Sequence, residues 1–198
     1  MTSSKGLPFL NLPGFKGKVA IVTGHRAGIG KAVAGLLEEH GVRVFGFDLP
    51  EVDLYRLDEI QGRVDAVATQ AGRIDILINN AGMTNMGDVV ETPLEKVEAV
   101  LTLNLKAPFM LMKAVIPHLI QTGGGAIVNN ASDQALVGKR FSAIYGASKA
   151  GLAQLTRSAA LDWAGHRIRV NCVAPGSTDT PMLRRVLHDL QERYPDVY

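Results

Sequence analysis

The chain has 198 residues, of which 46% are hydrophobic and 20% charged, and its 21 basic and 19 acidic residues give a net charge of +2. These values are typical of one globular domain with a sizeable core, and the mild charge argues against a protein built to bind nucleic acid. The single cysteine, Cys172, excludes an internal disulfide and fits a reducing cytoplasm, the compartment that we expect. No apolar stretch of membrane-spanning length is predicted, so no membrane partner is expected.

The secondary structure is predicted from apolar runs and from the glycines and prolines that interrupt them. Residues 1–16, which contain Pro8, Pro13 and Gly14, are predicted to be a flexible leader, and residues 17–198 a single domain. Strands are predicted in chain order at residues 18–23, 42–47, 52–54, 75–79, 126–131 and 168–174. Helices are predicted at residues 29–40, 55–71, 93–105, 109–121, 145–163 and 181–192.

This alternation of strands and helices determines the expected fold class. Parallel strands need crossover connections, and helical crossovers cover the sheet on both faces. We therefore expect an α/β fold with a Rossmann-like doubly wound parallel sheet, in three α/β/α layers.

A glycine-rich turn, TGHRAGIG at residues 23–30, joins the first predicted strand to the first helix. Gly24 permits a tight turn, while Gly28 and Gly30 let the backbone approach a phosphate and let the helix pack on the strand. The helix N-terminus near Ile29 supplies free N–H groups and a positive dipole end. A glycine pattern alone is as typical of a plain turn, but this position between strand and helix favours a pyrophosphate site.

Asp48 and Leu49 follow the second predicted strand, where the adenosine ribose of a bound dinucleotide lies. A carboxylate at this position accepts hydrogen bonds from both ribose hydroxyls and repels a 2′-phosphate, so it favours NAD over NADP. Arg26 indicates the opposite preference, because a guanidinium can bind a phosphate. We expect Arg26 to face solvent or to make a weak phosphate contact.

Tyr145 and Lys149 are four residues apart and share one face of a predicted helix. A phenol with a pKa of about 10 is a poor base at neutral pH, and a nearby ammonium lowers that pKa. Ser132, near the end of a predicted strand, can donate a hydrogen bond to a substrate oxygen while Tyr145 exchanges the proton. Together with the glycine turn, these residues predict hydride transfer with a nicotinamide dinucleotide.

Six motifs, in this order and spacing, resemble the short-chain dehydrogenase/reductase family over nearly the whole chain after the leader. They are TGHRAGIG (23–30), NNAG (79–82), LTLNLKA (101–107), NNASD (129–133), YGASK (145–149) and NCVAPGSTDT (171–180). The resemblance implies that Tyr145 is the general acid/base and that Lys149 lowers its pKa and holds the nicotinamide ribose. It also implies that Ser132 orients the substrate oxygen and that Asn104 holds a proton-relaying water.

The same resemblance implies further cofactor contacts within the dinucleotide-binding catalytic domain at residues 17–198. Asp53 and Leu54 match the adenine contact. The adenosine side is lined by Asn80, Ala81 and Gly82. The nicotinamide end is bordered by Tyr145, Lys149, Pro175, Gly176, Thr178 and Thr180. No metal is expected, because Lys149 and the cofactor supply the positive charge.

The function expected is that of an NAD-dependent oxidoreductase that interconverts a secondary alcohol and a ketone. Residues 132–134 (SDQ) and 175–182 (PGSTDTPM) are similar to those of family members that act on sugar-like or polar cyclic alcohols, such as the dihydrodihydroxybenzoate dehydrogenase group. One alternative is an NADPH-dependent 3-oxoacyl-thioester reductase, and another is a non-catalytic dinucleotide-binding sensor or scaffold.

The resemblance also implies an assembly. The family pairs the helices predicted near residues 109–119 and 145–163 with the same helices of a second subunit, so a homodimer is expected. The family adds a further helix and strand after the last predicted helix, and with that strand a homotetramer is expected. The C-terminus is therefore expected either to be truncated or to lack a disordered end.

Overall fold

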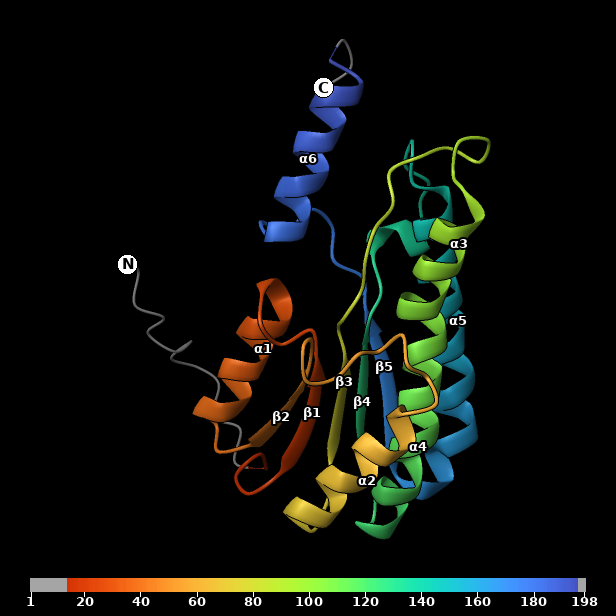
Figure 1. The fold of residues 1–198 in the computed structure, drawn as a ribbon. Coiled ribbons are helices and arrows are strands. Elements are labelled where there is room, and N and C mark those ends of the chain that lie inside the picture. Colours follow the sequence, from red (N-terminus) through yellow and green to blue (C-terminus); the bar gives the residue numbers. More distant parts are fainter. Residues whose placement is uncertain (1–13, 196–198) are drawn as a thin grey trace.

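The computed structural model describes residues 14–195 and contains a five-stranded sheet flanked by helices (Figure 1). The strands are β1 (Val19–Thr23), β2 (Arg43–Phe47), β3 (Ile76–Asn79), β4 (Gly125–Asn130) and β5 (Ile168–Val173). They lie in the order β2-β1-β3-β4-β5, and each neighbouring pair is parallel. The predicted doubly wound α/β fold is confirmed.

Helices cover both faces of this sheet. They are α1 (Gly28–Glu39), α2 (Ile60–Ala71), α3 (Leu94–Leu101), α4 (Ala107–Gln121), α5 (Ala143–Trp163) and α6 (Pro181–Arg193), with the short turns η1 (Thr102–Lys106), η2 (Asp133–Ala135) and η3 (Ala164–His166). α1 packs on one face and buries a smaller core, whereas α2, α4 and α5 bury the larger core on the other. α6 lies beyond the carboxyl ends of the strands (Figure 1).

Two predicted elements are wrong. Residues 52–54 form no strand in the described structure, although Val52 and Leu54 are buried in the larger core. Their apolar alternation reflects a loop that closes over the core, not a strand. The helix predicted at residues 55–71 begins only at Ile60, because the residues before it form turns in which Arg56 and Glu59 donate backbone hydrogen bonds three residues back.

The helices predicted at 93–105 and 109–121 form one continuous helical segment, Leu94–Gln121, interrupted by the π-helical turn η1. This segment has 28 residues, and its most apolar 18-residue window has a mean hydropathy of 1.5, so by length and composition it could cross a membrane and the expectation that no such stretch exists was wrong. Half of its most apolar window is buried inside the protein. Its packing against the sheet, α2 and α5 is that of a core helix.

The predicted leader falls mainly on residues 1–13, which lie outside the described residues. Phe15, near the end of that leader, packs against the smaller core and meets the ring of His40 edge-on, with 6.5 Å between the ring centres. Gly17 donates a backbone hydrogen bond to Gly41 (2.9 Å). The last residues of the predicted leader therefore belong to the packed domain.

Candidate active site

A cavity of about 660 Å³ opens at the carboxyl ends of the parallel strands. Its lining residues run from the turn between β1 and α1, through the segments that follow the other strands, to α6. Doubly wound sheets bind ligands at this place, because neighbouring crossovers leave the sheet in opposite directions there. The volume is within the range of small-molecule and cofactor sites.

The glycine-rich turn forms one end of the cavity. Gly24 and Gly28 have positive φ angles of +63° and +52°, a conformation that favours glycine. Gly30 has no room for a side chain, since a Cβ there would lie 2.1 Å from the Gly24 carbonyl oxygen. The Asn80 side chain holds the turn by donating to the carbonyl oxygens of Thr23 (3.0 Å) and Gly24 (3.2 Å). The result is the close strand–helix turn that a pyrophosphate site needs.

Asp48, which follows β2, lines the same end of the cavity. Its carboxylate accepts hydrogen bonds from the backbone N–H groups of Arg26 (3.2 Å) and Leu49 (3.0 Å). These two bonds orient the carboxylate. The Arg26 side chain lies outside the cavity, where it is half exposed and forms an ion pair with Glu51.

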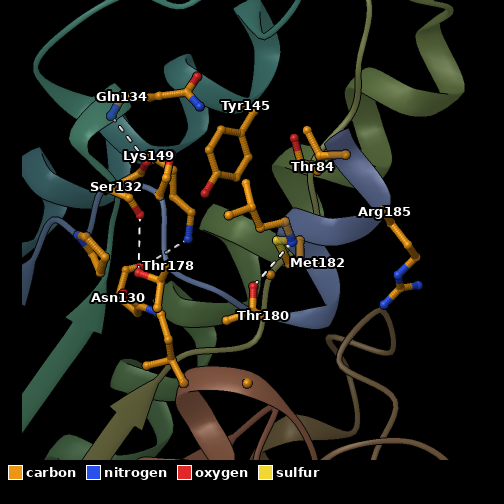
Figure 2. Close-up of a pocket in the computed structure, with 18 of the residues that line it drawn as sticks. Thr84, Asn130, Ser132, Gln134, Tyr145, Lys149, Thr178, Thr180, Met182 and Arg185 are labelled. Atoms are coloured by element: carbon orange, nitrogen blue, oxygen red, sulfur yellow. Dashed lines mark hydrogen bonds between the residues drawn. The ribbon is translucent and has the colours of Figure 1, made fainter. Parts of the chain in front are cut away.

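Ser132, Tyr145 and Lys149 come together at the other end of the cavity (Figure 2). Ser132 follows β4, whereas Tyr145 and Lys149 lie one turn apart on α5. The Lys149 ammonium lies 5.7 Å from the centre of the Tyr145 ring and donates to the carbonyl oxygen of Asn130 (2.6 Å). The Ser132 hydroxyl donates to the carboxylate of Asp133 (3.0 Å). The strand end and the helix face thus bring together the three groups predicted to handle a proton.

Burial changes the acidity of two of these groups. It raises the pKa of the Tyr145 phenol above its ordinary value, and the Ser132 hydroxyl opposes this only in part. Lys149 is not among the groups that shift the pKa of Tyr145, so the predicted lowering by Lys149 is not seen in this arrangement. Burial lowers the pKa of Lys149 itself from 10.5 to about 8, because a buried ammonium loses its hydration.

Asn104 lies in η1, is fully buried and does not line the cavity. Its side chain accepts from the Met83 N–H (2.9 Å) and donates to the Met83 carbonyl (2.8 Å) and the Ser148 hydroxyl (3.0 Å). Ser148 in turn donates to the carbonyl oxygen of Tyr145 (2.7 Å). Asn104 therefore connects the segment after β3 to the first turn of α5. Both of its amide hydrogens are donated to protein atoms, so a relay water could only donate to its oxygen.

Gly82 and three buried oxygens form part of the cavity wall. A Cβ on Gly82 would lie 3.1 Å from the Asn104 side-chain oxygen and 3.5 Å from the Lys149 ammonium, so a larger residue there would crowd Asn104. The side-chain oxygens of Asn130, Gln134 and Ser142 are buried without a hydrogen-bond partner among residues 14–195, and all three residues line the cavity. Because buried polar atoms are normally paired, these oxygens fit polar groups of a ligand.

Most residues predicted for the site line this one cavity. They are Gly24, Gly28, Ile29, Asp48, Asn80, Ala81, Gly82, Ser132, Tyr145, Lys149, Pro175, Gly176, Thr178 and Thr180. The others, Arg26, Gly30, Leu49, Asp53, Leu54 and Asn104, do not line it. Leu54 packs in the larger core, and the Asp53 carboxylate accepts from the backbone N–H of Tyr55 (2.9 Å). The individual cofactor contacts of all these residues remain predictions.

The sequence analysis missed the wall opposite Tyr145. This wall consists of Thr84 and Met86, of Lys139, Arg140 and Ser142, and of the face of α6 that contains Met182, Leu183, Val186, Leu187 and Leu190. The stacking of Tyr194 on Phe141, with 4.0 Å between ring centres, and a hydrogen bond from Arg193 to the Met86 carbonyl (3.1 Å) connect the end of α6 to this wall. The helical spacing of the apolar residues on α6 is the signal that predicts such an apolar face, of which only Leu190 is fully buried.

A group of three potential metal ligands, His188, Asp189 and Glu192, lies on α6 within the described residues. All three side chains are exposed and none lines the cavity. Exposed acidic groups of this kind are common without a metal, so this group adds nothing to the site.

Known proteins share this fold and part of the sequence. The family model described as short chain dehydrogenase matches residues 47–191. The 3-oxoacyl-[acyl-carrier-protein] reductase of Thermotoga maritima is 36% identical, over 89% of this chain and 80% of that protein. The aldohexose dehydrogenase of Thermoplasma acidophilum superposes with a TM-score of 0.86 at 30% identity, covering 92% of this chain and 74% of the other. A xylitol dehydrogenase solved with NAD+ superposes with a TM-score of 0.78 at 35% identity, covering 82% and 71%.

The chain belongs to the short-chain dehydrogenase/reductase family. It is thus an NAD(P)-binding oxidoreductase of the Rossmann type. Similar solved structures contain NAD+, NADH or NADP, so the family alone does not determine which dinucleotide this chain uses.

Proposed function

We propose that this protein transfers a hydride between NAD(H) and a secondary alcohol or ketone, in the cytoplasm and without a metal. The observation that supports this most directly is the single cavity, which contains the glycine turn and Asp48 at one end and Ser132, Tyr145 and Lys149 at the other. The nicotinamide of the bound dinucleotide would accept or supply the hydride. The side chains of the protein manage the proton and hold both molecules in place.

In this proposal Tyr145 exchanges the proton with the substrate oxygen, and Ser132 orients that oxygen. The Ser132 hydroxyl proton is directed to Asp133 (3.0 Å), and its oxygen accepts from the Gln134 backbone N–H (3.2 Å), so in this state one acceptor position of that oxygen remains for an alcohol. Lys149 supplies positive charge beside the phenol and binds the nicotinamide ribose. Asn104 acts through the hydrogen bonds that position the first turn of α5.

We propose that the substrate is a polar alcohol with a second hydrogen-bonding group. Gln134 and Ser142 each present a buried oxygen without a partner in the described structure, and both line the cavity near Tyr145. Unpaired buried groups of this kind select ligands that satisfy them. The similarity to an aldohexose dehydrogenase and a xylitol dehydrogenase supports the same substrate class. A panel of hexoses, polyols, cyclic diols and simple alcohols, assayed with NAD+ and NADP+, tests this proposal.

The 3-oxoacyl-thioester reductase alternative is favoured by the similarity to the Thermotoga maritima enzyme. It requires preference for NADPH, which Asp48 opposes. Reduction of an acetoacetyl thioester with NADPH, faster than oxidation of any alcohol in the panel with NAD+, would support this alternative. Binding of a dinucleotide without turnover of any compound would support the sensor or scaffold.

Asp48→Ala is expected to reduce the preference for NAD+ over NADP+ at least about tenfold, because it removes charge-assisted ribose hydrogen bonds together with the repulsion of the 2′-phosphate. Dissociation constants for both dinucleotides measured by calorimetry check this. Asp48→Asn, which keeps one of the two oxygens that accept from the Arg26 and Leu49 N–H groups, controls in part for damage to the turn, and the exposed Asp58→Ala should change neither constant. A wild-type protein that prefers NADP(H) would contradict the assigned role of Asp48.

We also propose that the protein forms at least a homodimer through α4 and α5. Phe109 on α4 is 52% exposed, Leu161 on α5 is 83% exposed, and the small residue Ala150 of α5 is exposed as well. Leu155, a partly buried residue of α5, lines a small apolar pocket together with Phe109 and Met110 of α4. An apolar face of this kind is buried when two copies pack about a two-fold axis.

Light scattering at micromolar concentration is expected to give the mass of a dimer or larger assembly. Phe109→Glu should shift the protein toward monomer, because it places a charge in the interface. Leu136→Glu, at another exposed apolar position (72% exposed), should not. A monodisperse wild-type monomer would refute the interface.

A further inference from the structure

The two residues after Gly24, His25 and Arg26, both lie close to β2 and the segment that follows it. His25 packs over β2, since a Cβ on Gly46 would lie 2.2 Å from its ring. Arg26 turns outward, where its guanidinium forms an ion pair with Glu51. The Arg26 backbone N–H donates to Asp48 (3.2 Å), so this ion pair lies next to the carboxylate that is expected to bind the adenosine ribose.

Arg26 is therefore a cation close to the place where a 2′-phosphate would lie. An unpaired guanidinium there would favour NADP, because arginine binds phosphate through two parallel hydrogen bonds. Glu51 occupies this guanidinium. A hydrogen bond from its own backbone N–H and the contact with Arg26 lower the pKa of Glu51, so it is ionised at neutral pH.

Glu51 opposes NADP in two ways. It occupies the N–H groups of Arg26 that a phosphate would need, and it places a second carboxylate near Asp48. NAD has a free 2′-hydroxyl instead of a phosphate, so neither effect acts strongly on it. Both partners are about half exposed, with side-chain exposures of 48% for Arg26 and 62% for Glu51, so the effect must be modest and reduced by salt.

We propose that Glu51 is a second determinant of cofactor choice, which acts by neutralising Arg26 and so prevents that arginine from binding the 2′-phosphate of NADP. This inference rests on the proposed binding of the adenosine ribose at Asp48. It assigns a role to Arg26 that the sequence left open between solvent exposure and phosphate contact.

The test is calorimetric titration of the whole protein with NAD+ and with NADP+ at low salt. Glu51→Gln is expected to lower the dissociation constant for NADP+ about three- to tenfold and to leave that for NAD+ within about twofold. The double variant Arg26→Ala/Glu51→Gln should lose this gain, because no guanidinium remains to bind the phosphate. Raising the salt concentration to about 0.5 M should reduce the gain in the single variant.

A matched control is available on α3 and η1, where Glu98 and Lys106 form an exposed ion pair at 2.9 Å. Glu98→Gln should change neither dissociation constant. An unchanged NADP+ to NAD+ ratio in Glu51→Gln would overturn the proposal. An equal gain in the single and double variants would also overturn it, since Glu51 would then act without Arg26. If the wild-type protein binds NADP+ more tightly than NAD+, the proposed preference for NAD at Asp48 is wrong. The proposal for Glu51 would still be tested separately, because it concerns the change in NADP+ affinity between wild type and Glu51→Gln.

Discussion

Tyr145→Phe is expected to lower kcat about 100- to 10,000-fold, the contribution typical of a general acid/base. The variant removes only the phenolic oxygen, which faces the substrate end of the cavity together with Ser132 and Lys149 (Figure 2). Binding of NAD+ should persist, because the glycine turn and Asp48 lie at the other end. Steady-state kinetics with the best alcohol of the panel and a separate NAD+ titration measure the two effects.

Tyr55→Phe is the matched control for this experiment. The Tyr55 hydroxyl donates to the sulfur of Met83 (2.9 Å), and Tyr55 does not line the cavity. This variant should retain wild-type turnover. If Tyr145→Phe retains more than a few per cent of the wild-type rate, the phenol is not the proton-transferring group.

Lys149→Met is expected to abolish turnover and yet to stabilise the folded protein by about 2 kcal/mol at pH 7. The decrease of the pKa of Lys149 from 10.5 to about 8 corresponds to a cost of about 3 kcal/mol for burying the ammonium. The variant avoids this cost but also loses the hydrogen bond from Lys149 to the Asn130 carbonyl, which destabilises it by about 1 kcal/mol. A residue that supports catalysis and costs stability is a common compromise at active sites.

The pKa of Lys149 also predicts the direction in which the free energy of unfolding changes with pH. Between about pH 8 and 10.5 the unfolded chain binds a proton at Lys149 that the folded protein does not, so the wild-type free energy of unfolding should rise with pH in this window. Below about pH 8 the full cost is present and this contribution is flat. Lys149→Met should lack the rise. Chemical denaturation at pH 7, 8, 9 and 10 measures it, with the exposed Lys96→Met as control. A destabilised Lys149→Met, or parallel pH curves, would refute this account.

The order of the elements was predictable because the local pattern and the global fold agree. β1 is a short apolar run that is buried throughout, and β3 is nearly so, whereas the edge strands β2 and β5 are partly exposed. Because these runs alternate with helical patterns, and glycine or proline follows several of them, chain order alone indicates a parallel sheet. The glycine turn could also be predicted from the sequence. Gly24 and Gly28 have positive φ angles that favour glycine, and Gly30 has no room for a side chain. Residues 52–54 were misread because burial of a loop and burial of a strand produce the same apolar alternation.

Long-range packing determined which side chains of the site contact one another. The spacing of Tyr145 and Lys149 predicts a shared helix face, but only the tertiary structure shows that the Lys149 ammonium is turned to Asn130 and that burial dominates both pKa values. In the sequence, Asn104 looks like an ordinary helix residue. Only the structure shows that it lies in the π-helical turn η1 and connects the segment after β3 to the first turn of α5. In the same way, Arg26 is ambiguous in the sequence, because its charge says nothing about its partner. Glu51 becomes that partner only when the chain after β2 folds back beside the cofactor turn, since the sequence determines which groups are present and the fold determines which of them meet.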